Sequence, residues 1–391
     1  MLNTPFSPWP SFSPEEADAV RRVLLSNRVN YWTGQEGRDF EKEFAAHVGT
    51  GHAVAVANGS VALDLALAAV GIGVGDEVIV TPRTFVASAS STALAGAVPV
   101  FADVDANSEN ITPGTVAPLI GPKTKAIVCV HHAGWPCDMR GFRELAGNHG
   151  LKLVEDCAQA HGATYHGASV GSLGDIAAWS FCQDKIITTG GEGGMVTTDD
   201  RALWQSVWSG KDHGKSWQAV YATDHPPGFR WLHHTLGNNF RLTEMQSAIG
   251  RIQLGRLEAW SARRRANAEA IREAAGALSV IRVPDVPDHI GHARYKLDLF
   301  VNPEALRSGW SRDRIMNEIV SQGVPCFAGS CPEVYREKAF MDRGFGPPQR
   351  LAAAVRLGET CLTFLVHPTL TANEIEKTCE VLSRVAGAAK R

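Results

Sequence analysis

From about residue 12 to residue 250 the chain alternates short apolar runs with helical patterns, and short polar connections separate them. Most of the apolar runs are rich in valine or isoleucine, as strands are. They predict strands at 54–57, 77–81, 98–101, 126–131, 151–155 and 176–179. Strands that alternate with helices in this way predict an α/β domain with a largely parallel sheet.

The longest helical pattern covers residues 243–275, and Gly276 is expected to end it. This helix carries a basic run of Arg263, Arg264 and Arg265. Charged runs on helices are usually solvated, so we expect this run to face water rather than to form a binding site.

Beyond about residue 280 the elements become shorter. A strand is predicted at 295–301, and helices are predicted at 311–322 and 371–386. These elements predict a smaller α+β domain at the C-terminus. We therefore place a large domain with an N-terminal arm at residues 1–260 and the small domain at residues 261–391.

Composition narrows the class of protein. The chain has 391 residues, of which 44% are hydrophobic and 20% are charged, as in ordinary globular proteins. A formal net charge of -3 gives no reason to expect a nucleic acid or a membrane as partner. No apolar run approaches the roughly 18 residues that a membrane-spanning helix needs. The eight cysteines form no Cys-x-x-Cys pair, so we expect no metal site and a reducing, cytoplasmic location.

Lys185 is the first candidate for chemistry. It follows the predicted buried strand 176–179 and precedes the glycine-rich segment 190–194. An amine placed beside a buried strand is a candidate nucleophile. A lysine that bonds covalently to its cofactor is what pyridoxal phosphate chemistry requires. A surface lysine in an ordinary turn is the alternative.

A second group of residues could bind phosphate. Asn58, Gly59 and Ser60 join a predicted strand to a predicted helix, and N–H groups at a helix N-terminus bind phosphate well. Gly59 would allow close approach, and Ser60 would add a hydroxyl donor. Ser180, at the end of a strand, and Asn239, in a turn, are further candidates. Ordinary caps and turns are the alternatives for this group.

Three residues could contact a pyridine ring. Asp156 ends the predicted strand 151–155, at the edge of a parallel sheet where ligand sites form, and could pair with the ring nitrogen. Gln159 could donate to the phenolic oxygen, and Phe85 could stack on the ring face. A helix-capping aspartate and a core phenylalanine are the alternatives. Together the candidates supply the lysine, anion cradle, carboxylate and stacking surface that pyridoxal 5'-phosphate needs.

The order of these motifs resembles that of the DegT/StrS-type nucleotide-sugar aminotransferases over nearly the whole chain. The segments that carry the resemblance are 57–63, 75–78, 103–105, 132–138, 155–162, 180–185, 190–195 and 239–241, with Gly34, Phe40 and Glu41 near the start. The resemblance implies a fold-type I pyridoxal-phosphate enzyme. Its large domain is expected to hold a mostly parallel, seven-stranded sheet flanked by helices, with a smaller α+β domain after it.

The resemblance also implies roles at the cofactor ring. Lys185 matches the lysine that bonds the cofactor, and Asp156 matches the partner of the ring nitrogen. Gln159 matches the contact to the ring oxygen, and Phe85 matches the aromatic residue that stacks on the ring.

Four further residues match phosphate ligands. Gly59, Ser60 and Ser180 match ligands from the same subunit. Asn239 matches a residue that reaches the phosphate of the neighbouring subunit, so the resemblance implies a homodimer with shared active sites.

The chain departs from the family pattern at two places. Cys182, Gln183 and Asp184 precede the lysine where many relatives carry a histidine-proline stretch, and an extra glycine precedes Glu192. Both places border the substrate. Some relatives replace the lysine by histidine and dehydrate the sugar, so retention of Lys185 favours transamination.

The resemblance implies an enzyme that transfers an amino group from glutamate to a keto-sugar, with a nucleotide-linked sugar expected. Such a reaction serves amino-sugar, O-antigen or related glycan biosynthesis. Alternatives are a sugar dehydratase, an aminotransferase for a free keto-sugar acid and a non-catalytic regulator with the same fold. The sugar is expected to contact variable loops, here around 211–217 and 326–335.

Overall fold

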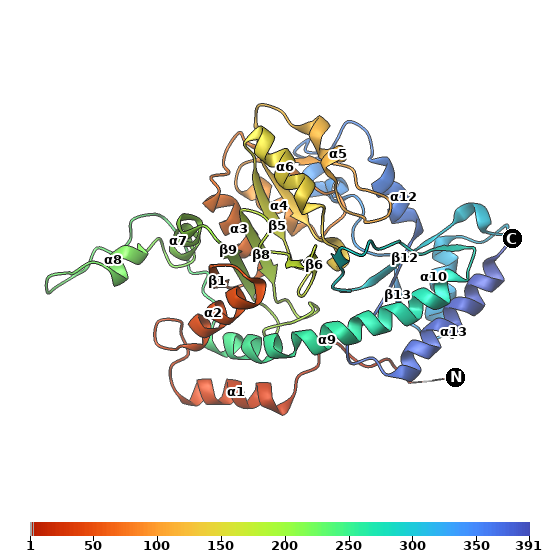
Figure 1. Cartoon of the computed structure of the whole chain (residues 1–391), viewed down its shortest axis with the longest axis horizontal. Coiled ribbons are helices and arrows are strands. Elements are labelled where there is room, and N and C mark those ends of the chain that lie inside the picture. Colours follow the sequence, from red (N-terminus) through yellow and green to blue (C-terminus); the bar gives the residue numbers. More distant parts are fainter. Residues whose placement is uncertain (1, 3) are drawn as a thin grey trace.

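The computed structural model describes residues 2 and 4–391, and these residues form three sheets (Figure 1). The largest has seven strands in the order β1-β9-β8-β5-β4-β2-β3. Its strands are β1 (His52–Val56), β2 (Glu77–Val80), β3 (Val98–Phe101), β4 (Thr124–Val130), β5 (Lys152–Asp156), β8 (Ile176–Ser180) and β9 (Gly194–Thr198).

The direction of the strands confirms the mostly parallel sheet. The strands from β3 through β2, β4 and β5 to β8 pair in parallel. β9 pairs antiparallel with both β8 and β1. The apolar runs predicted five strands besides β8 to within two residues at either end, whereas β9 was missed.

Helices cover both faces of the large sheet. On one face, α3 (Gly59–Ala69) and α7 (Arg201–Gly210) share one hydrophobic core with residues of β2 such as Val78 and Val80. On the other face, residues such as Ile127 and Leu153 pack with α6 (Met139–His149). α2 (Glu36–Val48) covers the same face over β1 and β8. Because both faces are buried, the parallel strands are apolar at most of their central positions.

A buried carboxylate fixes the loop that leads into β8. Glu155, on β5, accepts backbone N–H bonds from Gly171 (2.9 Å), Leu173 (2.8 Å) and Gly174 (2.7 Å). It also pairs with the ring of His131 at 3.0 Å. The hydrogen bonds and charge of His131 outweigh burial and lower the pKa of Glu155. The end of β5 is therefore held rigidly, one residue before Asp156.

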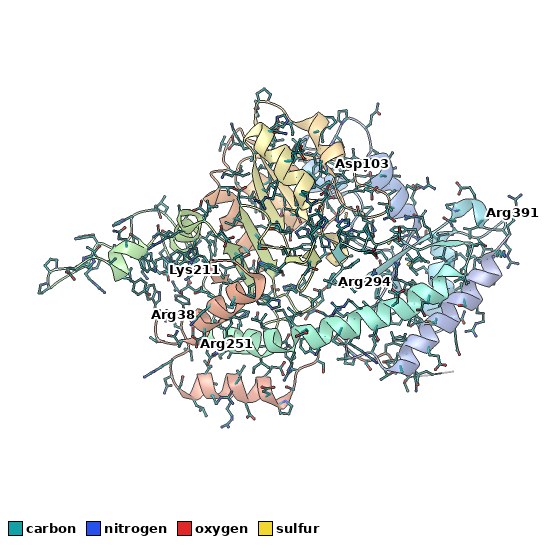
Figure 2. All side chains as sticks on the ribbon, in the orientation of Figure 1. Arg38, Asp103, Lys211, Arg251, Arg294 and Arg391 are labelled. Atoms are coloured by element: carbon teal, nitrogen blue, oxygen red, sulfur yellow. The ribbon has the colours of Figure 1, made fainter. Side chains whose placement is uncertain are left out.

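The long helix α9 (Glu244–Gly276) joins the large sheet to the C-terminal elements (Figure 1). Thr243 caps it in a capping box with Gln246. Near its start, Arg251 (labelled in Figure 2) donates to Glu43 and Glu36 of α2. The expected stop at Gly276 is wrong by one residue, because Gly276 is still helical and Ala277 is the C-cap.

The C-terminal part is built on a second sheet in the order β10-β12-β14-β13. These strands are β10 (Ile281–Arg282), β12 (Leu297–Val301), β13 (Cys326–Phe327) and β14 (Cys361–Phe364). α9 packs against α13 (Ala372–Ala389), and α10 (Arg312–Ser321) completes this core. The division of the chain at residue 260 stays a prediction; it falls inside α9.

The remaining elements are short or peripheral. A third sheet consists of β6 (Thr164–Tyr165), β7 (Ala168–Ser169) and β11 (Ile290–Gly291). α1 (Pro14–Leu25) packs on α9. The other α-helices are α4 (Ala87–Leu94), α5 (Pro113–Val116), α8 (Trp217–Tyr221), α11 (Lys338–Met341) and α12 (Ala352–Thr360).

Residues 212–240 form an arm that carries α8 and extends away from the body (Figure 1). Lys211 lies at its base and is fully buried (Figure 2). Its Nζ stands 3.7 Å from the centroid of the Tyr31 ring, and burial lowers the pKa of Lys211 to about 8. The arm is thus anchored to the body by a buried amine packed on an aromatic ring.

Candidate active site

The predicted ring contacts lie together at the carboxyl ends of the parallel strands. Asp156 ends β5 and is buried, and its carboxylate accepts bonds from the Ser88 hydroxyl (2.7 Å) and the Ala158 N–H (3.1 Å). The hydroxyl of Ser88 lies 2.9 Å from that of Thr84. Phe85, next to Thr84, leaves 66% of its surface exposed. The Thr84–Ser88 contact therefore ties the expected stacking residue to the expected ring-nitrogen partner.

Gln159 is oriented by a strained turn after β4. Its Oε1 accepts the N–H of Ala133 at 2.8 Å, which leaves Nε2 as the donor end of the amide. Ala133 has a φ of +51°, which is rare for a residue other than glycine. Gly134 follows with a φ of +91°, and a Cβ there would lie 3.0 Å from the Gln159 carbonyl oxygen. This turn was missed in the sequence, although the glycine was within the family motif.

The expected phosphate cradle is formed by the N-terminus of α3 and the end of β8. Gly59 begins α3, Ser60 is exposed beside it, and Asn58 caps the helix by accepting the Val61 N–H at 3.0 Å. A Cβ on Gly59 would lie 2.6 Å from the Cβ of Ser180. Only glycine lets the helix N-terminus come this near to the serine, as an anion cradle requires.

Lys185 is half-buried in the turn after β8, where two other segments hold it. Its carbonyl accepts a hydrogen bond from Trp9 Nε1 at 2.9 Å. Its Nζ lies 5.2 Å from the centroid of the Tyr295 ring. The Tyr295 hydroxyl donates a hydrogen bond to Asp184. Burial is the main cause that raises the pKa of Tyr295, and the negative charge of Asp184 raises it further. The N-terminal segment and the segment ahead of β12 thus position the lysine turn, and these contacts were not predicted from the sequence.

Asn239 lies at the surface, where the arm returns to the body. The carbonyl of the next residue, Phe240, accepts the N–H of Ala57 at 2.8 Å. This pairing places Asn239 beside the strand-to-helix junction of its own chain. Its expected contact with a neighbouring subunit stays a prediction.

The expectation of a solvated basic run on α9 is wrong for Arg264. Arg263 and Arg265 are exposed, but Arg264 is only 1% exposed. Its Nη1 donates to the Tyr295 carbonyl at 3.2 Å, and its guanidinium carbon lies 4.9 Å from the centroid of the Trp9 ring. Successive residues on a helix point about 100° apart, so one of three arginines faces inward while its neighbours face water.

A model of the DegT/DnrJ/EryC1/StrS aminotransferase family matches residues 10–383. The chain belongs to this family. The match spans the large sheet, the lysine turn and most of the C-terminal part, so it includes all the predicted site residues; Trp9 lies just before it.

Individual relatives agree with the family. The UDP-N-acetyl-3-dehydro-alpha-D-glucosamine 3-aminotransferase of Acidithiobacillus ferrooxidans is 35% identical over 356 residues, 91% of this chain and 90% of the relative. The structure of an aminotransferase from Psychrobacter cryohalolentis is 58% identical, with a TM-score of 0.97 over 98% of this chain and 100% of that one. DesV of S. venezuelae, solved in complex with a ketimine intermediate, is 32% identical, with a TM-score of 0.87 over 98% and 99% of the two chains.

The family, the fold and the cofactor expected from the sequence are confirmed. The chain is a fold-type I aminotransferase, and its cofactor is pyridoxal phosphate. The residues present fit this group: a glycine opens the cradle at Ser180, a buried carboxylate ends β5, and an amine stands in the adjacent turn. In the part of the chain that the structure describes, no helix is long and apolar enough to cross a membrane.

Proposed function

We propose that this enzyme transfers an amino group from glutamate to a nucleotide-linked keto-sugar in amino-sugar biosynthesis, such as that of O-antigen or a related glycan. The observation that carries the proposal is the grouping of Lys185, Asp156 and Gln159 at one edge of the sheet. It is found in a chain that is 35% identical to a UDP-sugar 3-aminotransferase over nine-tenths of both lengths. A second relative, GDP-perosamine synthase of Caulobacter vibrioides, is 44% identical over 61% of this chain.

Each residue has a task in this proposal. Pyridoxal phosphate supplies, when bound, an electron sink for the carbon that loses its proton. Lys185 Nζ takes the proton from Cα of the amino donor and returns a proton to the reacting carbon of the sugar. Asp156 would hold the proton on the pyridine nitrogen by its charge, and Gln159 Nε2 would donate to the phenolic oxygen.

The N-terminus of α3 serves the phosphate. Gly59, Ser60 and Ser180 would hold the dianion through N–H and hydroxyl donors, where the helix dipole adds to the attraction. Phe85, whose ring is exposed, would cover one face of the cofactor and exclude water from it.

A labelling experiment tests this function. The purified holoenzyme is incubated with ¹⁵N-glutamate and a UDP-, GDP- or dTDP-linked keto-sugar, and the products are analysed by mass spectrometry. We expect one equivalent of 2-oxoglutarate for each ¹⁵N-amino sugar. A dehydrated sugar formed without glutamate would support a dehydratase instead. A parallel incubation contains a free keto-sugar acid instead. If only that incubation gave an amino product, the nucleotide would be removed from the proposal.

We propose that the enzyme is a homodimer, with the arm 212–240 in the interface. The arm exposes large apolar side chains: Phe229, Trp231 and Leu236 are 79%, 82% and 100% exposed. Exposed apolar groups of this size favour burial against a partner.

Analytical ultracentrifugation tests this proposal. We expect the wild-type protein to have twice the 42.0 kDa mass of one chain, and we expect Trp231→Glu to shift it toward the monomer. Val74→Glu, at a site 92% exposed outside the arm, is the control. A monomeric wild-type protein would contradict the proposal.

We also propose a cytoplasmic location. All eight cysteines lie within the described residues and carry free thiols, which suits a reducing compartment. Cell fractionation with detection of the enzyme tests the location, and recovery in an extracytoplasmic fraction would contradict it.

A further inference from the structure

A cavity of about 380 Å³ lies beside the lysine turn. The N-terminal segment, the lysine turn and the C-terminal sheet meet there. Among the residues that line it are Trp9, Asp184, Arg264, Tyr295, Lys296 and His367. Arg294, labelled in Figure 2 near the middle of the molecule, precedes Tyr295 and Lys296 in the segment that leads into β12. The volume is in the range of small-molecule sites.

Arg264 borders this cavity with part of its hydrogen-bonding capacity unused. Nη1 donates to the Tyr295 carbonyl, whereas Nε and Nη2 have no hydrogen-bond partner within residues 2 and 4–391. Nε–H and the neighbouring Nη2–H form the side-on edge of the guanidinium. This edge binds the two oxygens of a carboxylate or phosphate in a bidentate manner.

Lys296 adds a second positive charge to the wall. It is half-buried, and its Nζ lies 4.9 Å from the centroid of the Tyr295 ring, the same ring that Lys185 approaches at 5.2 Å. Burial lowers the pKa of Lys296, and the charge of Asp184 opposes this change. The two lysines therefore approach the same ring, which connects the cavity wall to the lysine turn.

The acid in this wall does not neutralise the arginine. Asp184 accepts the hydroxyl of Tyr295, and no ion pair links it to Arg264 among the described residues. The ring of His367 stacks on that of Trp9, with 6.0 Å between the ring centroids. Burial, and to a smaller extent the charge of Arg264, lowers the pKa of His367 to about 4. The histidine is therefore neutral at pH 7. Burial lowers the pKa of Arg264 to about 9, which is still above pH 7, so the guanidinium keeps its charge.

A buried charge without a counterion is costly, and a bound anion removes that cost. We propose that this cavity binds an oxyanion of the substrate, a carboxylate or a phosphoryl group, with Arg264 and Lys296 as its cationic wall. The proposal rests on the proposed function, since the anion belongs to the amino donor or to the nucleotide of the sugar. Trp9 packs on the guanidinium of Arg264 and donates a hydrogen bond to the carbonyl of Lys185, so the N-terminal segment is part of this site.

Anion binding to the holoenzyme tests the proposal without turnover. Glutarate, a dicarboxylate that has no amine, and uridine diphosphate, which has no sugar, are titrated separately by calorimetry. Lys296→Met is expected to weaken binding of at least one of them about tenfold or more, because a charge-assisted contact is lost. Arg264→Lys keeps the charge but loses the side-on edge, and a loss of affinity is expected there as well.

The control is Lys338→Met. It also removes one positive charge, but from an exposed lysine at the start of α11 that pairs with Asp342. A loss confined to glutarate assigns the anion to the amino donor, and a loss confined to uridine diphosphate assigns it to the nucleotide. Equal affinities in Lys296→Met, Arg264→Lys, the control and the wild type would overturn the proposal, as would a wild type that binds neither anion. Failure of the proposed function is separate, since it would show as absent amino transfer with anion binding intact.

Discussion

Lys185→Ala is expected to lower the rate of amino transfer on the order of 10⁴-fold, the upper range for loss of a general acid/base. The variant loses both the group that bonds the cofactor and the amine that moves the proton at Cα. Its fold should persist, because the Trp9 bond is made to the backbone carbonyl of residue 185 and not to the side chain. Single-turnover measurements with ¹⁵N-glutamate give the rate, and far-UV circular dichroism checks the fold.

Two further measurements make this result specific. Borohydride reduction of the wild-type holoenzyme should attach the cofactor to the peptide that contains Lys185, and the variant should remain unlabelled. Added methylamine should restore part of the lost rate, since a free amine can replace the missing proton carrier. Amino transfer near the wild-type rate in Lys185→Ala would exclude the role of the lysine and would favour the non-catalytic regulator.

Buried strands were the most predictable part of the fold. β2, β4 and β5 are covered on both faces, so each carries a short apolar run rich in valine or isoleucine, as a buried strand does. β9 was missed because Gly194, Thr197 and Thr198 interrupt its apolar pattern. Its position between β8 and β1 is set by pairing with strands far away in the sequence.

Candidate site residues could be chosen from the sequence where one residue type near a strand end suggests one task. Asp156 and Lys185 are of this kind. Ser88 and Ala133 were not found, because their roles depend on hydrogen bonds to Asp156 and Gln159, which are distant in the sequence. Arg264 was misjudged because a run of three like charges says nothing of which one faces the core.

Asp156→Ala is expected to slow amino transfer on the order of 10²–10³-fold, the cost of removing one preorganised electrostatic group. Without the carboxylate, no charge favours the proton on the pyridine nitrogen, and the cofactor withdraws electrons less well. The same substitution removes the acceptor for Ser88 and Ala158, so a loss of stability is expected too. Steady-state kinetics and thermal melting of the holoenzyme measure the two effects separately.

Asp156→Asn separates these roles. An amide oxygen can still accept the Ala158 N–H, so the stability is expected to stay near that of the wild type. The negative charge is gone, so the rate should fall almost as far as in Asp156→Ala. Ser88→Ala is the matched control, since it removes a neighbour of the carboxylate but keeps the charge, and it should lower the rate far less. If Asp156→Asn kept both the wild-type rate and the wild-type melting temperature, Asp156 would only stabilise the turn after β5, and the partner of the ring nitrogen would have to be sought elsewhere.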